Sequence, residues 1–357
     1  MTIKSAPRAF AALLAPALIV AGAAIYAQSS DKGPIVMILD RFTAASVPTM
    51  GDAEIAAPAR APRASTAMTL ADLPGKGLAQ HPMVYIGEGD NTIYLVDQGQ
   101  VVWTFQTGVG WELDDVWLMS NGNVLFSRMS YIEEVTPDKK IVWHRDAPAG
   151  TEIHGCQPIG LDRVLLIENG TPARLLVVNT KTGKTEVDHE IPDAGASVHP
   201  QFRRVRMTAA GTYLLPFLMK DSVVEYDKDF KPIWTYDIPS PWAAVRLQNG
   251  NTLITDEKDQ LAREVNPRGE TVWEYRLRQD LPAGMVMTGS QSLVRLANGN
   301  TVICSRGDNG KGLQLIEVTP DKKLVWALYD WKNLGPATAV QILDEPCVPE
   351  QPGQCQR

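Results

Sequence analysis

The chain repeats a short phrase built on Asn-Gly-Asn, and this repeat limits what it can fold into. The phrase is MSNGNVLFSR at 119–128, LQNGNTLITD at 247–256 and LANGNTVICSR at 296–306. Asn-Gly between two apolar runs is typical of a tight hairpin, because both residues tolerate the positive φ of a two-residue turn. We therefore expect Asn298-Gly299, and its counterparts, to join the innermost strand of each repeat to the next strand.

A tryptophan recurs near the end of the rows that this phrase defines. It lies in QVVWTF, KIVWHR, KPIWTY, ETVWEY and KLVWAL, as Trp103, Trp143, Trp234, Trp273 and Trp326. A further row from 151 fits the same frame with Asp188 in place of the tryptophan. Each row contains about four short strands in roughly 40–50 residues, which is typical of a β-propeller blade. The tryptophan is expected to pack each blade against its neighbour.

The number of rows predicts six blades. The rows begin near 82, 111, 151, 198, 241 and 285, and the first row lacks its innermost strand. The segment PATAVQILDE at 336–345 matches PWAAVRLQN in an earlier row, so we expect it to supply that strand and to remove the free sheet edge. The predicted fold class is all-β: a six-bladed β-propeller of four-stranded antiparallel blades, closed by the C-terminal strand.

The segments outside the rows differ in composition from the propeller, which is assigned to 81–346. Residues 1–30 join a basic start to an uncharged run, which indicates an export signal that is either cleaved or retained as a membrane anchor over 9–30. Residues 31–80 are rich in Ala and Pro and predict an arm or linker, whose apolar stretch 34–42 could dock on the body. Export places the body in the periplasm or outside the cell, touching a membrane only through an uncleaved N-terminal segment.

The cysteine pattern is consistent with the oxidising compartment that export implies. We expect Cys347 and Cys355, in the C-terminal tail 347–357, to form a loop-closing disulfide, and Cys156 and Cys304 to be free and buried. The net charge of −7 argues against a nucleic-acid partner. Because no CxxC or HExxH spacing occurs, no metal ion is predicted. No other cofactor is predicted either. The chain is expected to be a monomer.

The innermost strands of a propeller line its central channel, and their first residues form one mouth. Counting seven residues back from each turn places three candidate ligand-binding side chains there: Asp114, Trp242 and Gln291. His154 occupies the same column, and His199 and Arg203 lie at or beside it in the fourth row. Arg128 and Arg306, at the ends of second strands, would complete a mixed-charge mouth that suits a small polar molecule.

Two sets of residues in or near this mouth suggest chemistry. Imidazole changes its charge near neutral pH, so His154 and His199 are candidate catalytic residues. Three arginines share one inner-strand position, three residues before the turn: Arg206, Arg246 and Arg295. Either they form a cationic ring for an anionic ligand, or each pairs with an acid of a neighbouring blade.

The NGN turn, the EV-x-P segment and the VVW-x-aromatic strand, repeated over 82–345, resemble the arylsulfotransferase-like propellers of bacteria. The resemblance implies a channel histidine that takes a sulfuryl group from an aryl sulfate and passes it to a phenol. Under it, His154 would be the nucleophile, with His199 and Arg203 as further catalytic residues. Members of that family have more histidines at these inner-strand positions. In this chain the same positions are occupied by Asp114, Trp242 and Gln291. The chain is also, more distantly, similar to quinoprotein-like propellers, but no quinone is predicted.

Two functional hypotheses follow. In the first, an exported propeller binds a small polar or anionic ligand at the channel mouth, with arylsulfotransferase-like transfer as its catalytic form. In the second, the propeller is a non-catalytic scaffold that uses its flat faces for protein contact.

Overall fold

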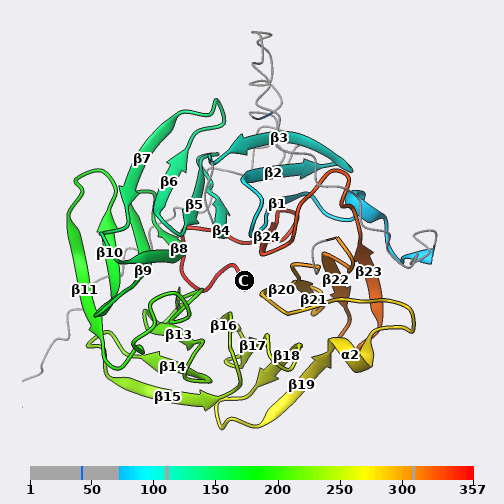
Figure 1. Cartoon of the computed structure of the whole chain (residues 1–357). Helices are drawn as coiled ribbons and strands as arrows, with labels where there is room; N and C mark the ends of the chain where they lie inside the picture. Colours follow the sequence, from blue (N-terminus) through cyan, green and yellow to red (C-terminus); the bar gives the residue numbers. More distant parts are fainter. Residues whose placement is uncertain (1–41, 43–71, 109–111, 308–309) are drawn as a thin grey trace, which may run out of the picture.

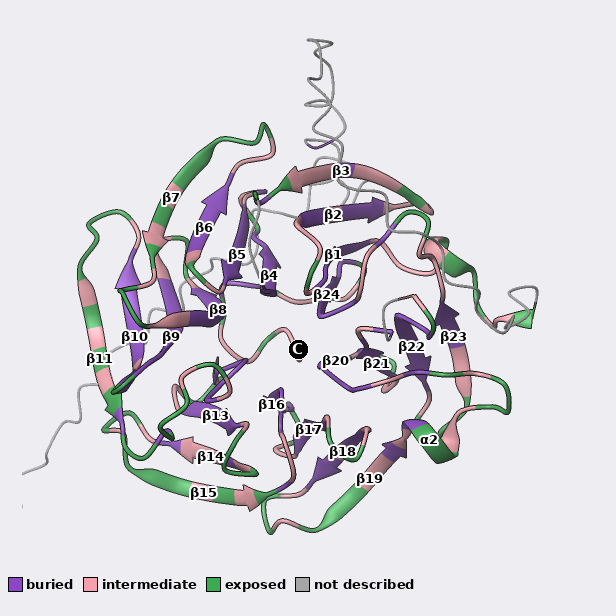
Figure 2. Ribbon diagram, in the orientation of Figure 1, coloured by how far each residue is buried: buried purple, intermediate pink, exposed green. Residues whose placement is uncertain are grey.

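The computed structural model describes residues 42, 72–108, 112–307 and 310–357. In this part of the chain, six four-stranded antiparallel sheets stand around a central channel (Figure 1). The six-bladed β-propeller predicted from the repeat is therefore confirmed. The innermost strands are largely buried, whereas the outermost strands alternate between exposed and partly buried side chains (Figure 2).

The blades are numbered here in chain order, and their strands run from the channel outward. Blade 1 contains β24 (Ala339–Ile342), β1 (Met83–Ile86), β2 (Thr92–Asp97) and β3 (Gln100–Gln106). Blade 2 contains β4 (Leu113–Leu118), β5 (Val124–Arg128), β6 (Tyr131–Val135) and β7 (Ile141–Asp146), and blade 3 contains β8 (Glu152–Ile159), β9 (Arg163–Asn169), β10 (Ala173–Asn179) and β11 (Thr185–Ile191). Blade 4 contains β12 (Arg206–Met207), β13 (Tyr213–Phe217), β14 (Ser222–Tyr226) and β15 (Pro232–Asp237). Blade 5 contains β16 (Ala244–Arg246), β17 (Thr252–Asp256), β18 (Leu261–Val265) and β19 (Thr271–Arg276), and blade 6 contains β20 (Ser292–Arg295), β21 (Thr301–Cys304), β22 (Leu315–Val318) and β23 (Leu324–Leu328). Two short helices, η2 (Gly77–Ala79) and α2 (Leu277–Asp280), complete the described elements.

The C-terminal strand closes the ring as predicted. β24 pairs antiparallel with β1, and Val84 lies opposite Gln341 in their register. The pairing extends past the strand ends, because Thr338 donates its main-chain N–H to Ile86 and accepts one from Glu88 through its hydroxyl group. Blade 1 is thus built from two parts of the chain that lie far apart in sequence, and its inner edge is not left free.

The Asn-Gly turns are longer than the predicted two-residue hairpins. Gly122 donates its N–H to the carbonyl of Met119, and only the glycine of the Asn-Gly pair has a positive φ, of 88°. The same pattern recurs at Gly250 and Gly299. This is a four-residue turn with glycine at its last position, where positive φ is needed, so the asparagine keeps an ordinary conformation.

The repeated tryptophans join neighbouring blades, as expected. Trp234 of blade 4 donates its indole N–H to the carbonyl of Pro267 in the outer turn of blade 5 (3.1 Å), and Trp273 of blade 5 does the same to Pro320 of blade 6 (3.0 Å). The guanidinium group of Arg246 lies 5.0 Å from the centre of the Trp234 ring. Each such contact buries apolar area and satisfies a polar atom at a blade boundary.

The arginine column pairs with acids, so the alternative of a cationic ring is excluded. Arg206 contacts Asp115 at 2.8 Å, Arg295 contacts Glu264 at 2.8 Å, and Arg246 contacts Glu225. For Arg246 and Arg295 the acid belongs to the preceding blade, so these ion pairs bridge the same boundaries as the tryptophans.

The C-terminal tail covers the end of the channel where the Asn-Gly turns lie. The second residues of these turns, Ser120, Gln248 and Ala297, donate their N–H groups to C-terminal side chains: Glu350 Oε1 (2.5 Å) and Gln356 Oε1 (3.0 Å) in the tail, and Glu345 Oε2 (2.6 Å) just before it. The predicted disulfide between Cys347 and Cys355 is present, and the chain then enters the ring, where Arg357 is buried (Figure 1). Cys156 and Cys304 are free and buried, as expected.

Residues that precede the first blade also contact it. Phe42 is buried and meets the Trp103 ring edge-on at 5.2 Å between ring centres. Gly77, in η2, accepts the indole N–H of Trp326 at 2.8 Å, so part of the predicted arm packs on blade 6. The predicted export signal at 1–30 and most of the arm lie outside the described residues. None of the helices that the structure describes is long and apolar enough to cross a membrane.

His81 fixes the region where the ring closes. Its Nε2 lies 3.1 Å from Glu317 of blade 6, and its Nδ1 lies 3.0 Å from Asp344, which follows β24. Burial lowers the pKa of His81, but hydrogen bonds and charge interactions with Asp344 and Glu317 outweigh burial and raise it to about 9. The imidazolium therefore bridges two carboxylates at neutral pH.

Raising the pH from about 7 to about 10 should reduce the free energy of unfolding through His81. Its folded pKa lies above its unfolded value of about 6.5, so the stabilisation is complete below pH 6.5 and is lost as the pH rises through 9. Urea unfolding of the wild type and of His81→Gln across this range measures the effect, and the variant should be less pH-dependent. Identical pH dependence in both proteins would contradict the assignment.

Candidate functional site

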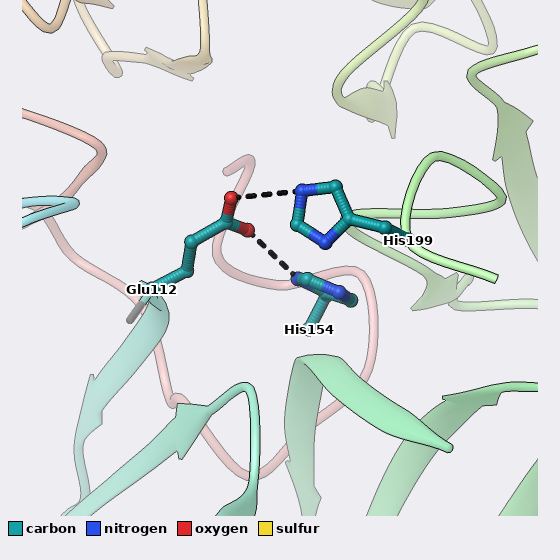
Figure 3. A group of neighbouring side chains, drawn as sticks. All are labelled: Glu112, His154 and His199. Atoms are coloured by element: carbon teal, nitrogen blue, oxygen red, sulfur yellow. Dashed lines mark ion pairs between the residues drawn. The ribbon is translucent and has the colours of Figure 1, made fainter. Parts of the chain in front are cut away.

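The candidate site lies at the mouth formed by the first residues of the innermost strands, opposite the end that the tail covers. Glu112 and Asp114 come from the start of β4, Glu152 and His154 from the start of β8, and His199 from the loop before β12. Figure 3 shows the Glu112 carboxylate directed toward both imidazole rings, with an ion pair to each. Blades 2, 3 and 4 therefore each contribute to one cluster.

Two β-bulges turn the buried members of this cluster toward each other. In β4, Leu113 pairs with Arg128 and Asp115 with Ser127, which leaves Asp114 as the extra residue. In β8, Ile153 pairs with Glu168 and Gly155 with Ile167, which leaves His154 as the extra residue. A bulge re-aims the side chain of its extra residue, and bulges of this kind are common next to functional sites. Here they bring His154 Nδ1 to 2.8 Å from Asp114 Oδ2.

His154 is fully buried and is held on both sides by carboxylates. Its Nδ1 faces Asp114 and also lies 3.2 Å from Glu112 Oε2, while its Nε2 lies 2.8 Å from Glu152 Oε2. Burial and the charge of Arg203 lower the pKa of His154, but Asp114 and Glu112 outweigh them and raise it to about 10. Burial has the opposite effect on the acid and raises the pKa of Asp114. Because three carboxylates face the ring, we assign the proton of the His154–Asp114 pair to the imidazole.

His199 contacts the same acids but is half exposed at the mouth. Its Nδ1 lies 2.8 Å from Glu152 Oε2, and its Nε2 lies 3.1 Å from Glu112 Oε1. The side chain is 48% exposed, whereas that of His154 is 0% exposed. Burial raises the pKa of Glu112, but hydrogen bonding to His154 and the charges of Arg203 and both histidines outweigh it and lower that pKa to about 2.

Arg203 closes one side of the cluster and connects it to the rest of the mouth. Its Nη2 lies 3.1 Å from His199 Nε2 and 3.4 Å from Glu112 Oε2, and its Nη1 donates to the carbonyl of His199. The guanidinium group is 4.7 Å from the centre of the Trp242 ring. Arg306 approaches the same ring at 5.8 Å, so Trp242 lies beside two cations that belong to different halves of the mouth.

The other half of the mouth contains a polar cavity of about 560 Å³. Arg306 lies in its lining, 3.1 Å from Glu88 and 2.5 Å from Glu257. Buried Gln291 donates its side-chain amide to Glu88 at 3.1 Å. Burial raises the pKa of Glu257 even though Arg306 opposes this. The cavity therefore offers carboxylate, guanidinium and hydroxyl groups to a small polar ligand.

The structure brings most of the candidate residues together. His154, His199, Arg203 and Asp114 form the first half of the mouth, and Trp242, Arg306 and Gln291 lie in or beside the second. Arg128 is different: it is buried, and its guanidinium group donates to Asn91 and Thr107 at the boundary with blade 1. Sequence counting did not single out Glu112 and Glu152. The available signal was that each stands two residues before the counted column, in neighbouring rows.

Glu112, His154 and His199 form a group that could hold a metal ion. Their ligand atoms lie within 4.8 Å of one another. The Oδ1 atom of Asp114 is buried and accepts no hydrogen bond, whereas the buried Oε2 atom of Glu112 contacts His154 Nδ1 at 3.2 Å and Arg203 Nη2 at 3.4 Å. Glu112 approaches the two imidazoles through different oxygens, with Oε1 at 3.1 Å from His199 Nε2 and Oε2 at 3.2 Å from His154 Nδ1. A metal ion bound by these two nitrogens could therefore be held by one or both oxygens of this carboxylate.

Comparison with known proteins supports the fold. No protein-family model matches the chain, and no curated protein matches it. A protein of unknown function from Bacteroides caccae is 25% identical, with a TM-score of 0.66 over 73% of this chain and 97% of its own. A catalytically inactive variant of virginiamycin B lyase from Staphylococcus aureus, solved with quinupristin, is 12% identical, with a TM-score of 0.51 over 74% of this chain and 90% of its own. These likenesses establish the propeller; the arylsulfotransferase-like resemblance is not established by them.

Proposed function

We propose that the propeller binds a divalent metal ion at Glu112, His154 and His199 and uses it to hold a small oxyanion-bearing ligand at the channel mouth. The observation that carries this proposal is the convergence of these three side chains from three blades, beside a buried Asp114 carboxylate oxygen that lacks a hydrogen-bond donor. Because the Asp114 carboxylate faces His154 Nδ1, it is available as a further ligand.

Glu152 has the position of an outer-shell carboxylate. Its Oε2 atom lies 2.8 Å from His154 Nε2 and 2.8 Å from His199 Nδ1, the two ring nitrogens that face away from Glu112. A metal-binding histidine usually donates its other N–H to such a group, which fixes the tautomer and the ring orientation. One carboxylate would therefore prepare both imidazoles to bind a metal ion through the nitrogens that face Glu112.

The charges of the cluster are also consistent with a divalent ion. Glu112, Asp114 and Glu152 supply three negative charges close together, and Arg203 supplies one positive charge. A divalent cation that displaces the His154 proton would leave both imidazoles neutral and bring this buried group to neutrality, which burial favours. Arg203 Nη2 lies near His199 Nε2 and Glu112, so the guanidinium group must move slightly aside when the metal binds.

The neighbouring cavity suggests the kind of ligand. A metal ion with open positions at the mouth would face the cavity that Arg306 lines, and a carboxylate, sulfate or phosphate group would contact both cations. There the metal would act as a Lewis acid toward a ligand oxygen, and Arg306 would orient the ligand. Trp242, buried next to both arginines, would hold the two guanidinium groups in place through its aromatic ring.

Sulfuryl transfer through His154 has less support than this site. The convergence of His154, His199 and Arg203 is what such transfer needs, but a nucleophilic histidine must offer a free lone pair to the substrate. Both ring nitrogens of His154 face carboxylates, and the ring is buried. Of the two histidines, His199 is the one that a substrate can reach.

Isothermal titration of the full chain with Zn²⁺ and with Mn²⁺ tests the proposal. We expect one ion per chain in the wild type, a loss of affinity of at least about 100-fold in Glu112→Gln, and a loss of about 10–100-fold in Glu152→Gln, which replaces the outer-shell carboxylate by a neutral amide. Glu88→Gln, in the other half of the mouth, is the matched control and should bind metal like the wild type.

Ligand binding is then measured by thermal shift with small carboxylates, phosphate esters and aryl sulfates, each with and without the metal. Stabilisation that requires both the metal and Glu112 is the expected result. If metal binds equally well to the wild type and to Glu112→Gln, the metal site is wrong. If metal binds as proposed but no oxyanion stabilises the protein, the ligand assignment is wrong and the scaffold hypothesis gains support.

A further inference from the structure

A second cluster of charges lies inside the channel, separate from the mouth. Asp115 points away from Asp114 and is surrounded by three guanidinium groups, those of Arg204, Arg206 and Arg357. All four residues are at least 95% buried. Arg204 and Arg206 come from the segment that leads into β12, and Arg357 comes from the tail.

Asp115 accepts hydrogen bonds from only one of these arginines. Arg206 binds it through both terminal nitrogens, with Nη1 at 2.8 Å from Oδ2 and Nη2 at 3.2 Å from Oδ1. Arg204 and Arg357 approach Oδ1 only at 3.8 and 3.5 Å, without forming a hydrogen bond to it. Within the described residues, Asp115 is the sole carboxylate in ion-pair contact with any of the three.

Arg204 and Arg357 also retain unused donors. The Nε and Nη1 atoms of Arg204 and both terminal nitrogens of Arg357 are buried and have no hydrogen-bond acceptor. The aromatic face of Trp117, 4.1 Å from Arg357 and 5.1 Å from Arg206, compensates part of the positive charge but accepts no conventional hydrogen bond. A buried cation with unsatisfied donors is strongly unfavourable unless something supplies negative charge.

The neighbouring ionisable side chains do not supply this charge, and the main-chain oxygen of Arg357 accepts its hydrogen bond from Arg206 Nε, at 2.9 Å, and not from the unused donors of Arg204 and Arg357. The thiols of Cys156 and Cys304 are buried, and burial raises the pKa of each, so both are neutral near pH 7. The Asp114 carboxylate is directed toward His154 at the mouth. Side chains around Asp115 therefore leave two guanidinium groups without a carboxylate of their own.

We propose that the channel holds a small monovalent anion, such as chloride, bound by the free N–H groups of Arg204 and Arg357 beside Asp115. Because these positively charged planar donors are buried, they favour a small and weakly hydrated anion over a larger or more strongly hydrated one. Because Arg357 reaches this position only when the tail is seated over the channel, the anion also joins the tail to blade 4.

Thermal unfolding in different sodium salts at constant ionic strength tests the site. Replacing gluconate by chloride or bromide should raise the wild-type Tm by roughly 2–5 °C in a saturable manner, because the anion binds the folded state alone. Fluoride, which is strongly hydrated, should have little effect. Arg204→Met should lose most of the halide dependence, whereas Arg163→Met, which removes a surface arginine of blade 3, should retain it.

A crystal of the wild type grown in bromide provides a test that does not depend on how the variants fold. We expect an anomalous peak within hydrogen-bonding distance of both Arg204 and Arg357. A channel without bromide, or halide stabilisation that is unchanged in Arg204→Met, would overturn the proposal. Because the mouth cluster uses other residues, the metal titration and this experiment can fail independently.

Discussion

Asp115→Asn should lower the free energy of unfolding by about 3–5 kcal/mol, since it removes the carboxylate shared by three buried guanidinium groups. Asparagine has almost the same shape, so the loss is one of charge and hydrogen bonding. The Asp115 carboxylate also accepts the main-chain N–H groups of Val116 and Cys156. An amide nitrogen in place of either oxygen would face a donor and leave it unsatisfied.

Urea denaturation of the wild type and the variant measures this difference. The matched control is Asp188→Asn on β11, where the ion pair with Arg174 is exposed to solvent and should contribute less than about 1 kcal/mol. A loss below about 1 kcal/mol for Asp115→Asn would show that the channel arginines are compensated by other means.

Gly87→Ala should be the most damaging substitution at the point of ring closure, with a loss of about 3 kcal/mol or more. A Cβ atom at Gly87 would overlap the main-chain carbonyl of Pro336, just before β24. A backbone carbonyl cannot rotate aside as a side chain can, so the closing segment would have to separate from β1. The hydrogen bonds from Thr338 to Ile86 and from Glu88 to Thr338 would weaken with it.

Gly89→Ala is the control for this prediction. Gly89 has a φ of 78° but open space where its Cβ would lie, so alanine should cost only the roughly 1–2 kcal/mol of a left-handed conformation. Urea unfolding gives both values, and hydrogen exchange should show that Gly87→Ala loosens the β1 amides in particular. If the two variants lose the same stability, the close approach to Pro336 does not limit this position.

The fold was predictable because most blades carry sequence signals within their own row of residues. The Asn-Gly turn and the outer tryptophan mark two fixed points in a row, and the segment at 336–345 repeats the inner-strand pattern closely enough to identify the closing strand. The course of the tail was not predictable, because its contacts are to main-chain N–H groups such as those of Ser120 and Gln248, which any residue supplies.

The candidate site was predictable only in part. Counting from the turns found His154 and His199, because all blades share one inner-strand length to a first approximation. The bulges at Asp114 and His154 shift this count, and nothing in the residue pattern marks them. The candidate metal group was missed because its residues come from three blades, so no short spacing connects Glu112, His154 and His199.

The bulge in β4 also explains why two adjacent aspartates have different roles. Asp114 is the unpaired residue and turns to His154 at the mouth, whereas Asp115 pairs with Ser127 and faces the channel arginines. A one-residue shift thus serves two separate electrostatic clusters. A sequence pattern of two consecutive acids does not distinguish such an arrangement from an ordinary solvated turn.

The composite first blade has a consequence for the order in which the molecule can be assembled. During synthesis β1 emerges early, but the strand that pairs with its inner edge, Ala339–Ile342, is made only after the other five blades. Until then the backbone of β1 presents unpaired N–H and C=O groups, which are a template for pairing with other chains. The growing chain therefore has an unpaired sheet edge for most of its synthesis. A chaperone that shields Met83–Ile86 would protect this edge until the closing strand is made.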